Sequence, residues 1–526
     1  MIIYKIYNIQ YTIEGVNYMK NKKGFTLIEL LAVIIILAVI ALIATPIVLN
    51  VVDNARKSAN KDSAYGLLDS AKLYYMESLL DESKSLSGNL IDKINVSGSK
   101  PDGTVYINNK GEIAIAVVYD KVCFTKNYED ADLTESDDIE NCIVTVPREL
   151  YKDSVLNGAD PELKDNLVAV TINTDGTVKK ADIYSEWYNY TNKTWANAVL
   201  LNGNDTYKEG DIIIEDAIKA YYVWIPRYKY QIFYDGTNAT SKQLINIEFE
   251  DKNTTKSTST TKGEWLTHPA FTFGDTELNG MWVGKFELTG DTTNPTIKPN
   301  VESLRKQNVS TLFATTQKLS SNSSMLKNSE WGAVAYLTTS IYGQGLDEVR
   351  INNSSTFITG CAGRENNSAL CENRYNTSIG VLASTTGNIS GIYDMNGGSY
   401  EYVMGVMEDS LNSNIPSSGN SAQYNSGFTG KTTGTAANIT GVAFPESKYY
   451  DIYKYGTVWN DYTRYHLGDA TTETKGWNGD YKSFVGSSDP WFVRGGSYSE
   501  ERGTVGIFSF FGSYGTSGCA TRVVLR

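Results

Sequence analysis

The chain has 526 residues, enough for about three domains of ordinary size, and its hydrophobic content of 41% is sufficient for packed cores. Its formal charge of −13, from 60 acidic and 47 basic residues, argues against a dedicated nucleic-acid-binding protein. With 36 tyrosines, 45 glycines and only 11 prolines, the composition favours an extracellular, β-rich protein with many turns, and tyrosine-rich surfaces are common in recognition sites.

An apolar segment of roughly 25 residues, sufficient to span a bilayer, begins at Phe25 and contains a single carboxylate, Glu29. Lys20, Lys22 and Lys23 precede the segment, a pattern that retains this end in the cytoplasm. Because an acid inside the membrane costs about 2.5–3.5 kcal/mol, Glu29 indicates a function that supplies a partner for its charge. The alternative is an ordinary membrane anchor with a glutamate near the interface.

Residues 24–29, Gly-Phe-Thr-Leu-Ile-Glu, resemble the processing site of type IV prepilins and pseudopilins. The resemblance implies that a prepilin peptidase cleaves after Gly24 and that the new amino group on Phe25 is methylated. It also implies that Glu29 faces this amino group, in a neighbouring subunit, when the apolar stems pack into a filament. An amine and a carboxylate neutralise each other in an apolar bundle, where neither is tolerated alone.

The resemblance makes residues 1–24 a leader that is absent from the mature protein. Residues 19–24, Met-Lys-Asn-Lys-Lys-Gly, form a complete short leader, so we expect translation to start at Met19. Residues 25–146 are expected to form the stem and head of a pilin. Pro46 lies where pilin stems often carry a proline, and an amphipathic helix is predicted to continue beyond it and to end near Leu80.

A β-hairpin is predicted after the helix, with strands at 103–107 and 113–118. Cys123 and Cys142 then close an acidic loop. The helix, hairpin and cysteine loop together resemble a complete small pilin of a Gram-positive bacterium. In an exported protein the cysteine pair predicts a disulfide, worth about 3 kcal/mol for a loop of this size. Metal binding by two isolated cysteines is the less favoured alternative.

Residues 147–215 are predicted to form a small β-rich spacer module. Strands at 167–172 and 177–178 flank the turn sequence Asn-Thr-Asp-Gly, which is typical of a hairpin. Residues 187–196, rich in tryptophan and tyrosine, predict two more short strands. The sequence of this module does not indicate a function.

Residues 216–526 are predicted to form one large domain. In their order and spacing, four of its segments resemble the sulfatase-modifying-factor, or formylglycine-generating-enzyme-like, family, which has a C-type-lectin-like fold with many loops. The segments are 281–289, 331–337, 393–403, and 491–497 with the distant ending 521–525. The predicted fold class is therefore α+β: a transmembrane pilin helix with a small β-sheet head, a β-rich spacer, and a C-terminal C-type-lectin-like domain.

The resemblance does not extend to the catalytic residues of these enzymes. Formylglycine-generating enzymes use two cysteines between the Arg-Gly-Gly motif and the terminal strand, whereas this chain has only Cys519 there. A thiolate pair for copper-assisted oxidation cannot be built from one cysteine. Related iron enzymes need several histidines, and this chain has only His268 and His466. The chain contains the serine, histidine and aspartate residues that a catalytic triad requires, but it has no Gly-x-Ser-x-Gly motif around a nucleophilic serine. No catalytic residue and no enzymatic activity are therefore predicted.

A second disulfide is predicted between Cys361 and Cys371, which are close in sequence, and it leaves Cys519 unpaired among the five cysteines. No cofactor is predicted, although calcium is possible. Residues 459–461, Trp-Asn-Asp, look like the element that supplies calcium ligands in sugar-binding C-type lectins, but the companion loop is missing, and 298–300 is the nearest match. A purely structural role for Trp459 is favoured.

A second set of oxygen-bearing side chains, Asp394, Asn396 and Glu401, could also be calcium ligands, since calcium requires hard oxygens. The family likeness implies instead that this turn and its aromatic neighbours form core structure. No metal site is therefore assigned.

A recognition surface is predicted between the Arg-Gly-Gly motif at 494–496 and the terminal segment at 522–524. Strand alternation places Phe508 and Phe510 on one face and Ile507, Ser509 and Phe511 on the other, so that one face can pack and the other can meet solvent. The candidate ligand-binding residues are Tyr498, Ser499, Glu500, Arg502, Ser509, Phe511 and Tyr514.

Tyrosine, serine and glycine on a rigid frame are typical of adaptable binding surfaces. The layout of this segment also resembles the variable proteins of diversity-generating retroelements. The alternative is that these residues solvate an ordinary terminal sheet.

The combined features predict a minor type IV pilin-like or pseudopilin-like surface subunit that displays a C-type-lectin-like domain for adhesion or recognition. The expected partners are other pilin subunits, prepilin peptidase, inner-membrane lipid before assembly, and a surface glycan or protein ligand; nucleic acid is not expected. The expected location is the cell membrane, in a single pass, before assembly, and afterwards an extracellular pilus or pseudopilus. The alternatives are a structural pseudopilin of a secretion or DNA-uptake machine and an extracellular enzyme.

Overall fold

The computed structural model describes residues 26–526 apart from several short gaps and three longer ones. The gaps are 82–83, 85, 87, 97, 109, 145–148, 165, 235–240, 260, 364–369, 408–425, 430–441, 454–466, 487–488, 500–504, 514 and 516–517. The chain divides into two compact units, Met1–Pro147 and Arg148–Arg526, which are described separately.

The first unit is built on one long helix, α1 (Leu27–Ser78), which contains Pro46 and ends close to the predicted end near Leu80. An antiparallel sheet in the order β1-β2-β3-β4 packs against the later part of the helix. Its strands are β1 (Asp102–Ile107), β2 (Ile113–Tyr119), β3 (Val122–Lys126) and β4 (Thr134–Ser136). β1 and β2 form the predicted hairpin, in a register that pairs Val105 with Ile115.

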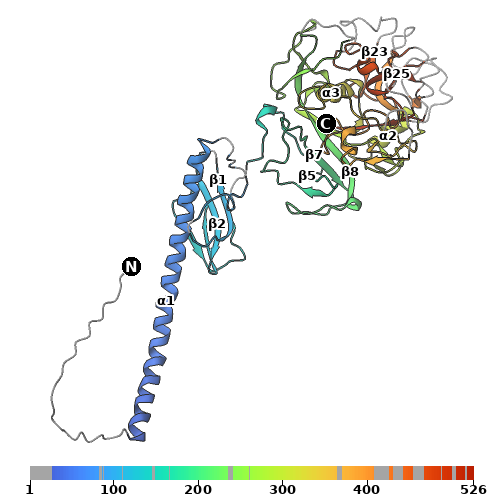
Figure 1. Ribbon diagram of the computed structural model, residues 1–526. Helices are drawn as coiled ribbons and strands as arrows, with labels where there is room; N and C mark the ends of the chain where they lie inside the picture. The colour runs from blue at the N-terminus through green and yellow to red at the C-terminus, as the bar shows by residue number, and fades with distance from the viewer. Residues whose placement is uncertain are drawn as a thin grey trace, which may run out of the picture. The chain divides into compact units, whose positions relative to one another are not determined.

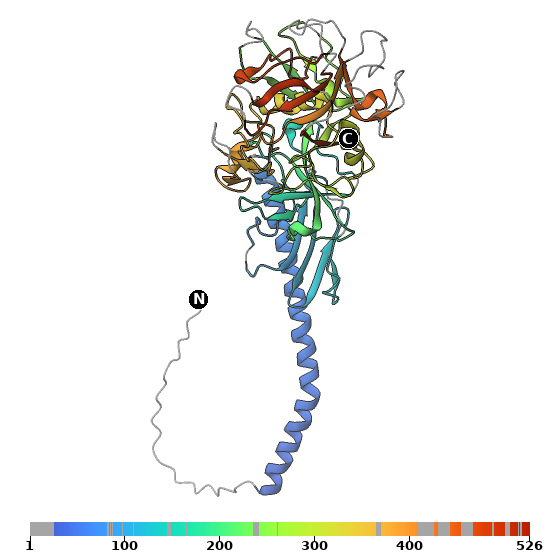
Figure 2. The same ribbon diagram turned by 90° about the vertical axis from the view of Figure 1, so that its right-hand side faces the viewer.

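The core of the first unit lies between α1 and the sheet. Leu67, Leu68 and Ala71 of α1 are buried in one apolar cluster with Val117 and Phe124 of the sheet. The part of α1 before Ala64 contributes no buried residue. Figures 1 and 2 both show this part of the helix extending past the sheet. The long apolar helix followed by a β-rich region agrees with the sequence prediction.

The second unit contains a seven-stranded sheet in the order β17-β27-β14-β8-β7-β5-β6, whose neighbouring strands are all antiparallel. The strands are β5 (Leu167–Ile172), β6 (Val178–Lys180), β7 (Asn197–Leu201), β8 (Ile218–Pro226), β14 (Gly280–Gly284), β17 (Ser323–Met325) and β27 (Val523–Leu525).

The seven-stranded sheet corrects the predicted organisation of residues 147–215, which are not a separate spacer. β5 and β6 form the predicted hairpin, but β7 pairs with β8 along most of its length. Ala198 and Val199 of β7 are fully buried in the same core as the rest of the second unit. The residues at 187–196 form only an isolated bridge between Asn189 and Thr194 instead of two strands.

A second sheet has the order β23-β20-β24-β25, with β26 also paired to β20. Its strands are β20 (Glu401–Met407), β23 (Asp451–Tyr453), β24 (Trp491–Gly495), β25 (Gly506–Ser513) and β26 (Ala520–Thr521). Helix α2 (Val309–Thr316) lies near β17, and α3 (Asn328–Thr338) contacts β20. Every residue of α3 is buried, so this helix passes through the core of the unit.

The remaining elements are short. One small sheet joins β9 (Tyr228–Gln231) to β10 (Asn246–Phe249) and β11 (Leu266–Thr267). The two-stranded pairs are β12 (Thr272–Phe273) with β13 (Thr276–Glu277), β15 (Thr289–Gly290) with β16 (Pro295–Thr296), β18 (Cys361–Ala362) with β19 (Asn373–Arg374), and β21 (Phe428–Thr429) with β22 (Val442–Ala443). Single 3₁₀ turns lie at Ser154–Leu156, Glu215–Ala217, Pro269–Phe271, Gly380–Ala383, Ser447–Tyr449 and Trp477–Gly479.

Candidate functional site

The first candidate site is the start of α1, where Thr26 caps the helix. The Oε2 atom of Glu29 accepts hydrogen bonds from the backbone N–H and from the hydroxyl of Thr26, each at 2.9 Å. The Thr26 hydroxyl oxygen in turn accepts from the Glu29 N–H at 3.3 Å, which completes a capping box. Glu29 therefore has a local partner within a single chain. Gly24 and Phe25, the predicted processing residues, lie outside the described part of the chain.

Helix α1 has the dimensions of a membrane span. Among the described residues, it is the helix that is long and apolar enough to cross a bilayer. Residues 27–52, at 1.5 Å per residue, are about 39 Å long, which exceeds the hydrocarbon core of a bilayer of about 30 Å. The hydroxyl of Thr45 donates to the carbonyl of Ala41 at 2.6 Å, so this polar group is satisfied inside the helix. The helix is consistent with a single-pass membrane anchor.

The head of the first unit contains the predicted disulfide between Cys123 and Cys142, whose Cα atoms are 5.6 Å apart. The acidic loop that the disulfide closes is also joined to the helix. The Nζ atom of Lys57 in α1 lies 2.9 Å from Asp137 and 3.9 Å from Glu135. The disulfide and the ion pairs together hold the loop against both the sheet and α1.

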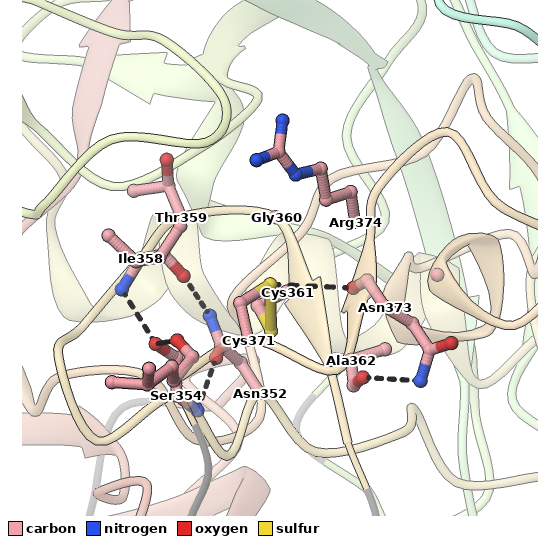
Figure 3. The surroundings of a disulfide bond; sticks show 12 residues. Asn352, Ser354, Ile358, Thr359, Gly360, Cys361, Ala362, Cys371, Asn373 and Arg374 are labelled. Atoms are coloured by element: carbon pink, nitrogen blue, oxygen red, sulfur yellow. Dashed lines mark hydrogen bonds between the residues drawn. A yellow bond between two sulfur atoms is a disulfide. The ribbon is translucent and has the colours of Figure 1, made fainter.

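The second unit contains the other predicted disulfide, Cys361–Cys371, also with a Cα separation of 5.6 Å. Figure 3 shows that it links β18 to the chain just before β19, where the Asn373 side chain donates to the carbonyl of Ala362 at 3.0 Å. Cys519 is buried and takes part in neither disulfide. The two predicted pairings are thus the ones present in the structure.

Three of the four family-like segments meet at a buried cluster of carboxyl groups. Glu401 in β20 pairs with Arg522 at 2.6 Å, and Asp394 accepts from the Asn352 side chain at 2.7 Å. Glu287 accepts from the Ser399 N–H at 2.9 Å and from the Ser303 hydroxyl. The cluster therefore joins the 281–289, 393–403 and 521–525 segments.

Burial controls the charge of this cluster. It raises the pKa of Asp394 to about 6 and that of Glu401 to about 7, and in both cases the charge of Arg522 opposes the effect. Burial also raises the pKa of Glu287 well above its usual value, with Glu401 and Asp394 adding repulsion. Three carboxyl groups with one guanidinium are thus held in a region that disfavours negative charge.

The remaining segment, 331–337, meets the Arg-Gly-Gly motif through a second buried guanidinium. Arg494 donates to the Asn328 side chain at 2.6 Å and to the carbonyl of Ser509 at 3.0 Å. Its guanidinium lies 5.4 Å from the Trp331 ring centroid, and the Trp331 indole donates to the carbonyl of Ile507 at 2.8 Å. Burial lowers the pKa of Arg494 to about 10.

The possible calcium ligands have other partners. Asp394 and Glu401 bind Asn352 and Arg522, and the Asn396 side chain donates to the carbonyl of Val349 at 2.6 Å. In the described part of the chain, no group of three His, Cys, Asp or Glu side chains has an arrangement that could hold a metal ion. The Trp-Asn-Asp element at 459–461 and His466 lie outside the described residues. His268 is buried, and burial lowers its pKa to about 3.

The predicted ligand-binding residues have different environments. Tyr498 is half-buried, its N–H donates to the carbonyl of Gly398 at 3.0 Å, and its ring lies 4.7 Å from that of Phe357. Ser499 is exposed and Phe511 is half-buried, with its ring 4.8 Å from that of Tyr400. Glu500, Arg502 and Tyr514 lie outside the described residues.

The structure corrects the alternation predicted for β25. Ile507, Phe508, Ser509 and Phe510 are all buried, so Ser509 does not face solvent. The strand is covered on both faces, because Ile507 and Ser509 of one face and Phe508 and Phe510 of the other are buried, and the Trp477 ring lies 5.3 Å from that of Phe508. Among the described residues of the predicted surface, the exposed or half-buried positions therefore lie near Tyr498 and Phe511.

A cavity of about 520 Å³ borders the predicted recognition segment at Val505 and was not selected from the sequence. Its lining includes Asp347, Glu348 and Arg350, which precede the second disulfide. The charged sequence Asp-Glu-Val-Arg at 347–350 is the only local signal for this site, and charged residues in a loop are too common to identify a cavity.

Residues 19–45 match the family model described as the prokaryotic N-terminal methylation motif. No curated protein matches the chain. The matched segment contains the predicted cleavage junction, Glu29 and most of the apolar part of α1. This motif, at the start of a helix able to cross a membrane, indicates a pilin-like or pseudopilin-like subunit that is processed by prepilin peptidase and assembles with other pilins.

Proposed function

We propose that the chain is a minor type IV pilin-like subunit that carries its second unit as a ligand-binding domain for adhesion or recognition. The match of the N-terminal methylation motif to residues 19–45 is the observation that carries the proposal. The second unit, residues 148–526, is much larger than the first, and such a unit on every subunit would crowd a filament. A rare position or a position at the tip is therefore favoured over the role of major pilin.

A C-type-lectin-like fold related to formylglycine-generating enzymes is proposed for the large C-terminal domain. Its support is the convergence of the four family-like segments on Arg494 and on the Glu401–Arg522 pair. The thiol needed beside Cys519 for the chemistry of those enzymes has no counterpart in the sequence between the Arg-Gly-Gly motif and the terminal strand. Binding is thus favoured over catalysis, and no resident cofactor is proposed.

A structural pseudopilin of a secretion or DNA-uptake machine is the second candidate, because the N-terminal motif fits it equally well. The negative charge of −13 favours recognition of a glycan or protein over capture of DNA. Adhesion of wild-type cells and of cells lacking the chain, measured on glycan and protein surfaces with and without calcium, separates the two candidates. Adhesion that is independent of the chain on every surface would favour the pseudopilin.

Processing and assembly are tested at the N-terminus. Peptide mass spectrometry of protein from filaments should find a chain that begins with methylated Phe25, and an intact Met1 or Met19 in assembled protein would contradict the proposal. The Glu29→Ala variant should be exported but should enter filaments poorly, because the terminal amine of a neighbouring subunit loses its partner. Asp62→Ala, an exposed position on the same helix, is the matched control and should assemble normally.

A further inference from the structure

A second cavity, of about 370 Å³, borders β5 in the second unit. Three parts of the chain line it: the end of β5 with the turn that follows, the segment from Trp187 to the start of β7, and the loop at 381–390. The lining is a mixture of apolar, aromatic and uncharged polar residues. None of the described residues that line the cavity has a charged side chain.

The wall formed by the loop at 381–390 is fixed to the neighbouring segment by hydrogen bonds. The Asn388 side chain donates to the carbonyl of Lys193 at 2.9 Å. The Ser390 hydroxyl accepts from the Trp195 N–H at 2.9 Å, and the Ser390 carbonyl accepts from the Asn197 side chain at the same distance. These bonds join two walls of the cavity, so a ligand does not have to organise them.

Lys285 supports the same wall from the core. It is fully buried, and its Nζ atom donates to Oδ1 of Asn197 at 2.9 Å. The same atom donates to the carbonyls of Ile389 and Gly391 at 2.6 and 2.8 Å. Three acceptors are as many as a lysine can serve, so this nitrogen is not available to a ligand. Burial lowers the pKa of Lys285 well below its usual value, which disfavours a positive charge beside the cavity.

Several polar groups of the lining remain open. The hydroxyls of Thr171, Thr174 and Thr194 form no hydrogen bond with any described residue. The indole N–H of Trp187 also has no described partner, and this side chain is 8% exposed. Three groups that both donate and accept, and one further donor, are therefore available to a ligand.

The lining disfavours two classes of ligand. An ion would lose hydration in a cavity that has no opposite charge, and a wholly apolar molecule would displace water from the hydroxyls without replacing its hydrogen bonds. An uncharged ligand that has hydroxyl groups beside C–H groups meets neither penalty. It can hydrogen-bond the threonines and also contact Ile172 and Val381, which are half-buried at the cavity. A pyranose ring has this composition.

We propose that this cavity binds one uncharged pyranose residue of a glycan. The three threonine hydroxyls and the Trp187 indole N–H bind the hydroxyl groups of the sugar, and Ile172 and Val381 contact its C–H groups. Binding requires no calcium, because no described carboxylate lines the cavity. The inference rests on the proposed function, since it names the ligand class of the displayed domain.

Saturation-transfer NMR on the full chain, in a detergent without a sugar head group, tests the proposal. The probes are the methyl glycosides of glucose, galactose and mannose, each compared with its uronic acid and its aminodeoxy derivative. Cyclohexanol represents an apolar ring of similar size. At least one neutral glycoside should bind, with a Kd at least tenfold lower than those of its charged derivatives and of cyclohexanol. EDTA should not change this Kd.

The same titrations contain the results that would overturn the proposal. The first is the absence of binding by all three neutral glycosides. The second is equal binding of a charged derivative or of cyclohexanol, which would show that neither the uncharged lining nor the hydroxyl groups select the ligand. Loss of binding in EDTA would assign the sugar to a metal site elsewhere in the chain.

Three variants locate the site. Thr171→Val combined with Thr194→Val removes two hydroxyls with little change in shape, and it should weaken binding of the glycoside by about tenfold at an unchanged melting temperature. Thr191→Val changes an exposed threonine that lies in the same segment as Thr194 but does not line the cavity, and it should bind as the wild type does.

Trp187→Phe keeps an aromatic ring and removes the indole N–H, so it provides a second measurement if the double valine variant melts at a lower temperature. It should weaken binding by about two- to tenfold. Wild-type affinity in the double valine variant or in Trp187→Phe, or an equal loss in Thr191→Val, would show that the sugar binds elsewhere.

A cell experiment separates failure of this inference from failure of the proposed function. If cells with the double valine variant adhere normally and no neutral glycoside competes, the sugar site is wrong but the recognition function stands. If wild-type cells adhere no better than cells that lack the chain, the recognition function itself fails. Loss of adhesion in the double valine variant together with competition by the glycoside would support both.

Discussion

Arg522 and Glu401 form a buried ion pair, in which Nη2 of the guanidinium donates to Oε1 of the carboxylate at 2.6 Å. Removal of one partner leaves an uncompensated charge in the core, so Glu401→Ala should lower the free energy of unfolding by about 3–5 kcal/mol. Urea denaturation followed by tryptophan fluorescence measures the change. The Arg305–Glu302 pair provides the control, since the Glu302 side chain is 62% exposed and Glu302→Ala should cost less than about 1 kcal/mol. Equal losses in the two variants would show that the buried pair has no special role.

The stability of the second unit should fall as the pH rises. Burial raises the pKa of Glu473 to about 7 from a usual value of 4.5, although Tyr230 and the Gly468 N–H donate to it at 2.8 and 2.7 Å. The folded state therefore binds this proton more tightly than the unfolded state, so the stabilisation is complete below about pH 4.5 and is lost as the pH approaches 7.

The contribution of Glu473 is on the order of 3 kcal/mol, and it is absent above its folded pKa. Asp394 and Glu401, whose pKa values are also raised by burial, act in the same direction. Urea unfolding at pH 5 and pH 8 should show the higher stability at pH 5, and Glu473→Gln should reduce the difference. A wild-type protein that is more stable at pH 8 would contradict this assignment.

The Cys123–Cys142 disulfide should stabilise the first unit. Replacement of both cysteines by alanine should lower its free energy of unfolding by about 3 kcal/mol, because the unfolded loop regains conformational freedom. Thermal unfolding followed by hydrogen exchange in β2 and β3 measures the loss. A reductant should lower the stability of these strands in the wild type and not in the variant; the same response in both would assign the effect to another bond.

The aromatic ends of the predicted recognition segment are expected to contribute to binding. Tyr498 packs on Phe357 at the surface, so Tyr498→Ala combined with Tyr514→Ala should abolish adhesion and leave the melting temperature nearly unchanged. Adhesion assays with a parallel thermal melt measure both effects. Retained adhesion would remove the segment from the binding surface, and an unfolded variant would assign these tyrosines to the core.

Local patterns in the sequence were sufficient for the helix, the first hairpin and the disulfide of the first unit, but not for β3 and β4. The apolar run that becomes α1, the turn between β1 and β2, and the spacing of Cys123 and Cys142 all depend on residues that are near one another in the chain. The strand that pairs with β7 could not be predicted from local patterns. The apolar side chains of Asn197–Leu201 require a buried neighbour, but they do not specify whether that neighbour is another spacer strand or β8.

The candidate site in the second unit was predictable only in part. Tyr498 lies at the surface as expected, but Ser509 is buried in a strand that Trp331 and Trp477, both far from it in sequence, contact at Ile507 and Phe508. The cavity at Arg350 has the same origin, because Gly363, Asn396 and Val505 reach it from three separate segments. No repeating pattern within a single segment predicts that residues of three segments lie together.

The position of β27 has a consequence for how the chain matures. β27 lies between β14 and β17 and pairs Val524 with Val283 on one side and with Ser324 on the other. During synthesis from the N-terminus, the edge of β14 stays open until residues 523–525 have been made, and an open strand edge is a template for aggregation. A chain interrupted shortly before β27 would contain every disulfide and nearly all of the core, yet it could not close its largest sheet. Closure of this sheet thus requires residues 523–525, and products that lack them should be prone to aggregation through the open edge of β14.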